Sequence, residues 1–202
     1  MLSLSDHKFY GPKGIGALYI RKGMKIENLI HGGGQERKRR AGTENIAGIV
    51  GLGKAIELAT ADIDGHNRRI RGMRNRLLQG ILTKIPGAYL NGHKEKRLPG
   101  NINVSFEFIE GESMLLWLDD EGICASTGSA CTSGSLEPSH VLLATGLPVE
   151  ISHGSLRLTL GVINTEQDVD FVLEVLPKVV SRLRDMSPLY RKRGKEGVSD
   201  VQ

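Results

Sequence analysis

Aromatic residues are scarce in this chain of 202 residues, at 4% of the sequence. Neither of its two short basic runs, RKRR at 37–40 and RKRGK at 191–195, contains one. Proteins that bind single-stranded nucleic acid place aromatic side chains beside basic groups so that bases can stack on them. The sequence therefore argues against a nucleic-acid-binding module and favours solvated charged surfaces for both runs.

Long apolar runs and cysteines are also few. No stretch approaches the roughly 18 apolar residues of a membrane span, and the first residues lack the residue order of a signal peptide. The two cysteines, Cys124 and Cys131, are too few for a disulfide scaffold and are typical of a reducing compartment. We expect a globular cytoplasmic protein without membrane contact, in which 39% hydrophobic residues supply one ordinary core.

The apolar spacing in the first part predicts a strand, a glycine-rich loop and two helices. The strand covers 15–20, and the helices meet near residues 60–66. The second helix carries its apolar residues on one face, namely Ile70, Met73, Leu77, Ile81 and Ile85. Its arginines lie largely off that face, so we expect a solvated role for them: Arg68, Arg69, Arg71, Arg74 and Arg76.

The pattern changes near residue 100, where short strands and short helices begin to alternate. The predicted strands are 102–106, 123–126 and 155–161, and the predicted short helices are 113–120 and 139–145. Thr165 and Asp168 have the spacing of a capping box for a last helix. Pro177 should kink or divide that helix.

These patterns divide the chain into three parts. Residues 1–62 form a first piece, 63–190 form a compact α+β lobe, and 191–202 form a basic tail. The tail has no apolar periodicity, so we expect it to be disordered.

A lysine in the opening stretch SLSDHKFYGPKGIGALY has the surroundings of a covalent cofactor site. Ser5 and His7 can donate to a phosphate beside Lys8, whose amine can form an imine with an aldehyde. Pyridoxal phosphate needs this combination. A plain surface lysine remains the alternative interpretation.

The segment TGSACTSGS places Cys131 among small and hydroxylated residues. A thiolate in such a segment can approach a substrate and then carry a group away, although an inert loop thiol has the same composition. Cys124 lies between Ile123 and Ala125 and is therefore predicted to be a core residue of a strand.

Two further positions are suited to bind anions. Arg157, on the polar face of its predicted strand, can bind a carboxylate through two N–H groups, or it can form a structural salt bridge. Thr43 precedes a helix, so it either receives an anion there or serves as a plain N-cap. No metal ligands are predicted.

Taken in order, the four motifs SxHKxxGPKGxGxLY, GGGQExxxRxGTxN, GSACTS and SLRLTLG resemble the second half of a cysteine desulfurase of the NifS/IscS kind. The resemblance extends to about Tyr190. It implies an α/β fold: the C-terminal part of the large domain of a class V, fold type I aminotransferase, followed by a small α+β domain. By this reading, residues 1–62 are the remnant of the cofactor-binding domain.

The resemblance also implies roles in cofactor binding. Lys8 would carry the imine with pyridoxal phosphate, and Ser5 and His7 would contact its phosphate. Thr43 would reach the phosphate of the neighbouring subunit in a homodimer. Asp6 departs from the family, which usually has a small residue there, and its charge is unfavourable near a phosphate unless it points away.

For the substrate, the resemblance implies that Arg157 binds the carboxylate of L-cysteine and that Cys131 takes its sulfur as a persulfide, leaving L-alanine. The sulfur would pass to an iron–sulfur scaffold protein or another acceptor. Because family members carry a large segment before the lysine, we expect a truncation or a split-gene half that needs a complementing N-terminal half. The alternative is a catalytically incompetent remnant that keeps the acceptor-binding lobe.

Overall fold

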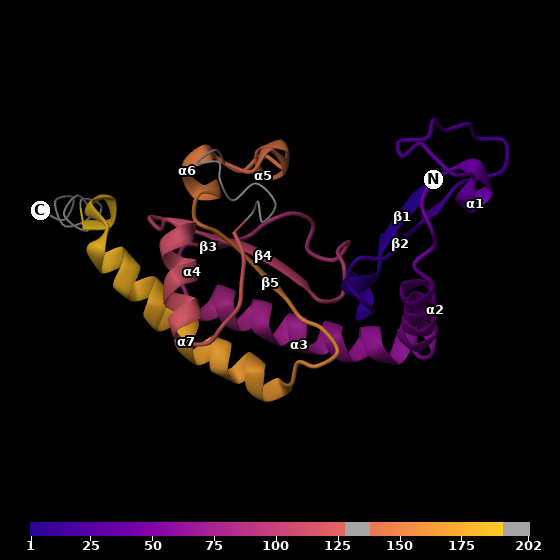
Figure 1. Ribbon diagram of the computed structural model, residues 1–202. Helices are drawn as coiled ribbons and strands as arrows, with labels where there is room; N and C mark the ends of the chain where they lie inside the picture. Colours follow the sequence, from indigo (N-terminus) through magenta and orange to yellow (C-terminus); the bar gives the residue numbers. More distant parts are fainter. Residues whose placement is uncertain (128–137, 192–202) are drawn as a thin grey trace, which may run out of the picture. The chain divides into compact units, whose positions relative to one another are not determined.

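The computed structural model describes residues 1–127 and 138–191. The chain forms two compact units, Met1–Asp64 and Gly65 onward, and each is described by itself (Figure 1). The boundary lies two residues from the position suggested by the sequence pattern.

The first unit begins with a small antiparallel hairpin. Strand β1 (Leu2–Ser5) pairs with β2 (Gly16–Tyr19), and Ser5 stands opposite Gly16. The strand predicted at 15–20 is therefore confirmed. Between the strands, the 3-10 helix η1 (Asp6–Phe9) ends at Tyr10, which has a left-handed φ of 72°.

Two helices complete the first unit. The short α1 (Gln35–Lys38) contains three successive non-glycine residues with positive φ, Glu36, Arg37 and Lys38, a conformation that costs energy in each of them. Helix α2 (Ile46–Thr60) is capped by Asn45, whose side chain accepts from the Gly48 N–H at 3.1 Å. The N-cap role considered for Thr43 is thus wrong, because the helix begins later.

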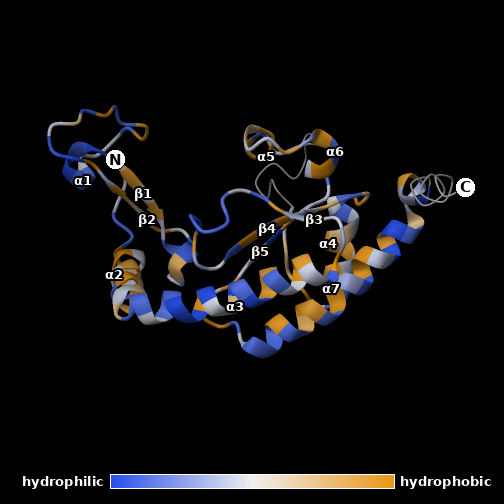
Figure 2. Ribbon diagram, turned by 180° about the vertical axis from the view of Figure 1, so that it is seen from behind, coloured by the Kyte–Doolittle hydropathy of each residue, from blue (hydrophilic) through white to orange (hydrophobic). Residues whose placement is uncertain are grey.

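The second unit is an antiparallel sheet with helices. Its strands are β3 (Ala88–Leu90), β4 (Asn101–Phe106) and β5 (Ser155–Thr159), in the order β3-β4-β5. The helices are α3 (Ile63–Lys84), α4 (Gly111–Asp120), α5 (His140–Ala144), α6 (Val149–Ser152) and α7 (Glu166–Met186). Figures 1 and 2 show α3 and α7 side by side along the sheet.

The core of this unit lies between the sheet and these long helices. All five residues of the predicted apolar face of α3 are at most 6% exposed, which confirms that face. Leu156 and Leu158 of β5 and the central residues of α7 join the same cluster. The helices approach closely at Gly80, where any side chain would collide with Leu173.

Of the five α3 arginines expected to be solvated, only Arg74 differs, whereas Arg68, Arg69, Arg71 and Arg76 are exposed. Arg74 is buried, and it donates to the Asn75 side chain and to the Leu98 carbonyl. Burial, together with the nearby charge of Arg71, lowers the pKa of Arg74. Arg69 donates to the carbonyls of Val162 and Asn164. These guanidinium groups fix α3 to the loops around it.

Helix α7 runs through Pro177 without being divided. Proline lacks the N–H that would bond to the carbonyl four residues earlier, which here belongs to Leu173. The ammonium group of Lys84 donates to that carbonyl at 3.2 Å, so the buried acceptor is satisfied. The predicted capping box of Thr165 and Asp168 is confirmed at the start of the helix.

Only part of the strand predicted at 123–126 forms. Ser126 pairs with Arg157 as an isolated bridge, and residues 123–125 are irregular. No helix within residues 1–127 or 138–191 is long and apolar enough to cross a membrane. Residues 192–202 of the predicted tail lie outside the described residues.

Candidate functional site

The lysine turn of the first unit is built from the end of β1 and from η1. The Asp6 N–H donates to the Ile15 carbonyl at 3.2 Å, and the Gly11 N–H donates to the Asp6 carbonyl at 3.1 Å, which closes the turn. Ser5, His7 and Lys8 are all exposed on it. The structure thus brings together a hydroxyl, an imidazole and an amine within four residues.

Asp6 is the one fully buried residue of this turn. Its exposed fraction is 0%, and neither carboxylate oxygen has a hydrogen-bond partner in the part of the chain that the structure describes. The carboxylate lies against Gly11, where any side chain would collide with it. The glycine of the GPKG turn therefore makes room for Asp6, a role that the sequence pattern did not reveal.

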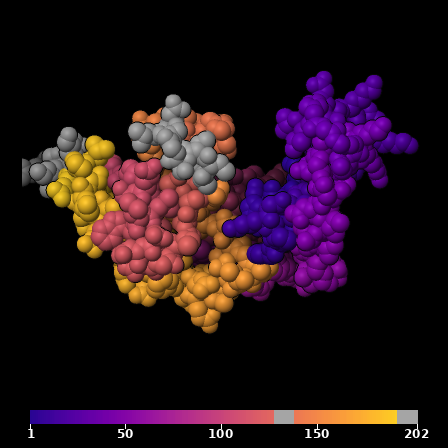
Figure 3. Space-filling view, viewed as in Figure 1, coloured from indigo at the N-terminus to yellow at the C-terminus, as the bar shows by residue number. Residues whose placement is uncertain are grey.

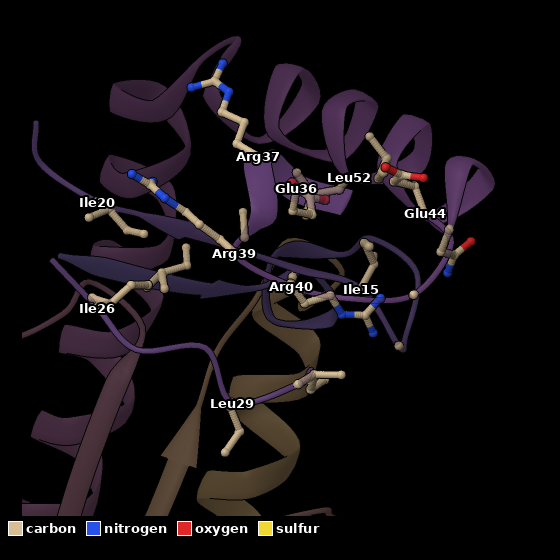
Figure 4. Close-up of a pocket in the computed structure, with 18 of the residues that line it drawn as sticks. Ile15, Ile20, Ile26, Leu29, Glu36, Arg37, Arg39, Arg40, Glu44 and Leu52 are labelled. Carbon is tan, nitrogen blue, oxygen red and sulfur yellow. The ribbon is translucent and has the colours of Figure 1, made fainter. Parts of the chain in front are cut away.

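Thr43 is exposed, and its neighbours Gly42 and Glu44 line a cavity of about 920 Å³ in the first unit. The lining comes from β2, the segments 26–30 and 36–45 and α2, and its apolar side chains alternate with three arginines at 37, 39 and 40 and three glutamates at 27, 36 and 44. In Figure 4, the Arg39 side chain extends toward Ile20, and Arg40 lies beside Ile15. The cavity therefore combines apolar side chains with charged groups of both signs.

Much of the apolar surface of this unit is uncovered. Helix α2 buries only Gly48 and Ala55, and the orange segments of its ribbon in Figure 2 mark its hydrophobic residues. Leu29 is 93% exposed. In the space-filling view, side chains in the violet part of the chain project individually (Figure 3). Exposed apolar area of this extent is typical of surfaces that another polypeptide covers.

Arg157 lies half-buried on β5 in the second unit. Its N–H donates to the Ser126 carbonyl at 2.6 Å, and its carbonyl accepts from the Ser126 N–H at 3.2 Å. No carboxylate among the described residues forms a salt bridge with its guanidinium group. The salt-bridge alternative for Arg157 therefore has no partner within residues 1–127 and 138–191.

The structure tests the prediction for one of the two cysteines, Cys124. Cys131 lies outside the described residues. Cys124 is exposed, so its predicted place in the core is wrong. Its neighbour Ile123 is buried, and because residues 123–125 do not join the sheet, the apolar sequence neighbours of Cys124 do not determine its own burial.

The predicted site residues fall into both units. Ser5, His7, Lys8 and Thr43 belong to the first, and Arg157 belongs to the second. The described residues contain no cluster of metal-ligating side chains.

The family model for class V aminotransferases matches residues 1–172. The chain belongs to this family, whose enzymes use pyridoxal phosphate. It is 66% identical over 192 residues to a cysteine desulfurase IscS of Methanosarcina thermophila and 62% identical to one of Clostridium botulinum. These matches cover 95% and 94% of this chain but 47% and 48% of the relatives, so the chain spans about half their length.

Solved structures agree with this family. A NifS-like protein superposes with a TM-score of 0.78 at 39% identity, over 89% of this chain and 45% of its own. A NifS-like protein from Rickettsia africae gives 0.79 at 30% identity, over 89% and 47%. The α/β fold and the resemblance to NifS/IscS enzymes are therefore confirmed.

The groups on the lysine turn fit pyridoxal phosphate. The Ser5 hydroxyl and the His7 imidazole are donors suited to a phosphate, and the Lys8 amine is suited to an aldehyde. All three are exposed, and the Asp6 carboxylate is turned against Gly11 inside the turn. The Asp6 carboxylate is therefore buried, whereas the three groups suited to the cofactor are exposed.

Proposed function

We propose that this chain is the C-terminal half of a pyridoxal-phosphate-dependent cysteine desulfurase, which converts L-cysteine into L-alanine and a protein persulfide. The observation that carries the proposal is the 66% identity to such an enzyme across 95% of the chain. The exposed Ser5, His7 and Lys8 on one turn support it independently. A free thiol is required, which favours a reducing compartment such as the cytoplasm.

The first unit would hold the cofactor. Ser5 and His7 would donate to its phosphate, the Lys8 amine would hold it through its aldehyde, and Thr43 would donate to the phosphate bound by a second subunit. When bound, pyridoxal phosphate supplies an electron sink that acidifies the Cα–H of an attached amino acid. The Lys8 amine would be the group that moves the proton at that carbon.

The second unit would hold and desulfurate the substrate. The Arg157 guanidinium binds the carboxylate of L-cysteine. The Cys131 thiolate attacks the substrate sulfur, the carbon–sulfur bond breaks with its electron pair left on the substrate, and a proton completes L-alanine. Cys131 follows Ser126 by five positions, a length of chain that spans at most about 18 Å. The bridge between Ser126 and Arg157 supports this pairing of roles.

A completing polypeptide would cover the first unit. The relatives are about twice as long as this chain, and the hairpin and α2 leave apolar side chains exposed. We therefore assign the complementing partner to the remaining half of such a relative, and propose that the complete enzyme forms a homodimer and passes sulfur to an acceptor or iron–sulfur scaffold protein.

The experiment combines this chain with a polypeptide equal to the remaining half of the Methanosarcina thermophila relative. With pyridoxal phosphate and L-cysteine, we expect equal amounts of alanine and of persulfide on Cys131, measured by peptide mass analysis. Cys131→Ser should abolish both, and Cys124→Ser is the matched control that should retain them. Turnover in Cys131→Ser, or a persulfide on Cys124 instead, would contradict the assignment.

A further inference from the structure

A row of polar residues crosses the sheet of the second unit. Asn103 of β4 stands opposite Arg157 of β5, the Asn91 N–H donates to the Asn103 carbonyl at 2.9 Å, and Ser126 pairs with Arg157 on the other side. The alternate residues of β4 and β5 form the apolar core. The order across the sheet is thus Asn91, Asn103, Arg157 and Ser126.

The backbone pairing brings the side chains of Asn103 and Arg157 close together. Both backbone groups of Arg157 bond to Ser126, so none is left for β4, and the Asn103–Arg157 pair is a non-hydrogen-bonded one. Residues in such antiparallel pairs approach more closely, with Cβ atoms about 4.5–5.5 Å apart. The two side chains lie on the same face of the sheet.

The amide of Asn103 is oriented by its neighbour. Asn91 Nδ2 donates to Asn103 Oδ1 at 2.7 Å and to Ser105 Oγ at 2.8 Å. Asn91 and Ser105 are buried, whereas Asn103 is half-buried. Because Oδ1 is turned toward Asn91, the NH₂ group of Asn103 points away from it. No hydrogen bond from that NH₂ group was found within the described part of the chain.

We infer that Asn103 and Arg157 together form a carboxylate-binding pair, and that Asn91 is a positioning residue for Asn103. The guanidinium supplies charge and two parallel N–H groups, and the amide adds a third donor without a further charge. The bound group is a small organic carboxylate. Its identification as the α-carboxylate of L-cysteine rests on the proposed function.

The test uses the full chain without cofactor, and sodium propionate as the probe. Propionate has a carboxylate on a three-carbon skeleton, and propionamide is a control of similar shape without charge. In NMR titrations, propionate should shift the Arg157 Nε–H signal and the Asn103 side-chain NH₂ signals together. Propionamide should shift neither.

Variants separate the two residues. Asn103→Ala should weaken propionate binding about tenfold, because a hydrogen bond to a charged group is lost. Asn103→Asp keeps the acceptor for Asn91 but should abolish binding, because its carboxylate occupies Arg157. Asn101→Ala, on the same strand and face, is the matched control and should bind like the unaltered chain. In Asn91→Ala, the Arg157 signal should still respond to propionate, whereas the Asn103 signals should not.

Unaltered propionate binding in Asn103→Ala or Asn103→Asp would overturn the inference. Propionate binding that leaves the Asn103 NH₂ signals of the unaltered chain unshifted would overturn it as well. The result is independent of sulfur transfer. If propionate binds as expected but Cys131 acquires no persulfide in the completed protein, the carboxylate pair stands and the proposed function fails. If persulfide forms but propionate binding ignores Asn103, only the inference fails.

Discussion

Helices α2 and α3 carry similar apolar patterns but have opposite surroundings. The predicted apolar face of α3 is buried from Ile70 to Ile85. On α2, the apolar residues Ile46 and Val50 are 70% and 66% exposed. The spacing of apolar residues thus identifies the face that a helix is built to bury, but the covering element must come from elsewhere. For α2, we propose that it comes from the remaining half of the enzyme.

The two sheets show the same contrast. In the second unit, β4 and β5 bury one face against the helices, with Ile102 and Leu156 fully buried. In the first unit, no residue of β1 or β2 is buried. A lone two-stranded hairpin is marginally stable in water. The second unit therefore has enough buried apolar side chains to fold by itself, whereas the first unit has few.

The largest expected effect compares the same substitution in the two helices. Leu77→Ala in α3, at 1% exposure, should lower the free energy of unfolding by about 2–5 kcal/mol through lost burial and a cavity. Leu58→Ala in α2, at 65% exposure, should change it by less than about 0.5 kcal/mol. Denaturant unfolding measures both, and equal losses would show that α2 is covered in the isolated chain.

The next test removes the buried carboxylate of Asp6, and here we expect a gain in stability. Asp6 has two unsatisfied oxygens in its turn, so Asp6→Ala should stabilise the hairpin by about 1–3 kcal/mol. Hydrogen exchange of the β1 and β2 amides measures this local opening. Faster exchange in the variant would mean that the carboxylate has a stabilising partner.

Removing the charge of Glu110 in the second unit should lower the stability of the fold, in contrast to the gain expected for Asp6→Ala. Burial by itself raises the pKa of Glu110. The hydrogen bonds from the Glu112 and Ser113 N–H groups and from the Ser113 hydroxyl, together with the charge of His153, lower this pKa by more, so the net shift is downward. A lowered folded pKa means that Glu110 stabilises the fold above the ordinary carboxyl pKa, and that this is lost as pH falls through the folded value.

Glu110→Gln should therefore reduce the free energy of unfolding by about 1 kcal/mol at neutral pH, as loss of a helix cap does. The difference from the unaltered chain should vanish in acid. Unfolding curves at several pH values measure it, and a difference that grows toward acid would reverse the sign and refute the account.

The smallest effect concerns Cys124. Because the thiol is exposed, Cys124→Ser should change the free energy of unfolding by less than about 0.5 kcal/mol. Alkylation of the folded chain should modify Cys124 without denaturant. Protection of this thiol, together with a large loss of stability in the variant, would restore the core position that its sequence neighbours suggested.

The sequence was sufficient where local chemistry decides the structure. The face of α3, the capping box at Thr165 and the strand around Arg157 depend on residue spacing alone, and each was predicted. The burial of Arg74 and Asp6 depends on segments distant in sequence or on a turn that closes over the side chain, so spacing did not reveal either. Cys124 was misplaced because apolar neighbours indicated a strand that only Ser126 joins.

In the candidate site too, contacts between sequence neighbours were predictable, whereas a contact between distant residues was not. The motif around Lys8 indicated the exposed donors Ser5 and His7, because they are adjacent in sequence. The pairing of Asn103 with Arg157 joins residues that are 54 positions apart, and only the strand register reveals it. Alternation of polar residues in NINVSF and SLRLTLG was the one available signal.

The central claim is that the lysine turn becomes a cofactor site only when the first unit is completed. It is tested most directly by adding pyridoxal phosphate, reducing with borohydride and locating the trapped cofactor by peptide mass analysis. We expect cofactor on Lys8 when the remaining half of the relative is present, none after Lys8→Ala, and retention after Lys13→Ala. Stoichiometric trapping on Lys8 in the chain alone, or trapping on another lysine in the completed protein, would contradict the claim.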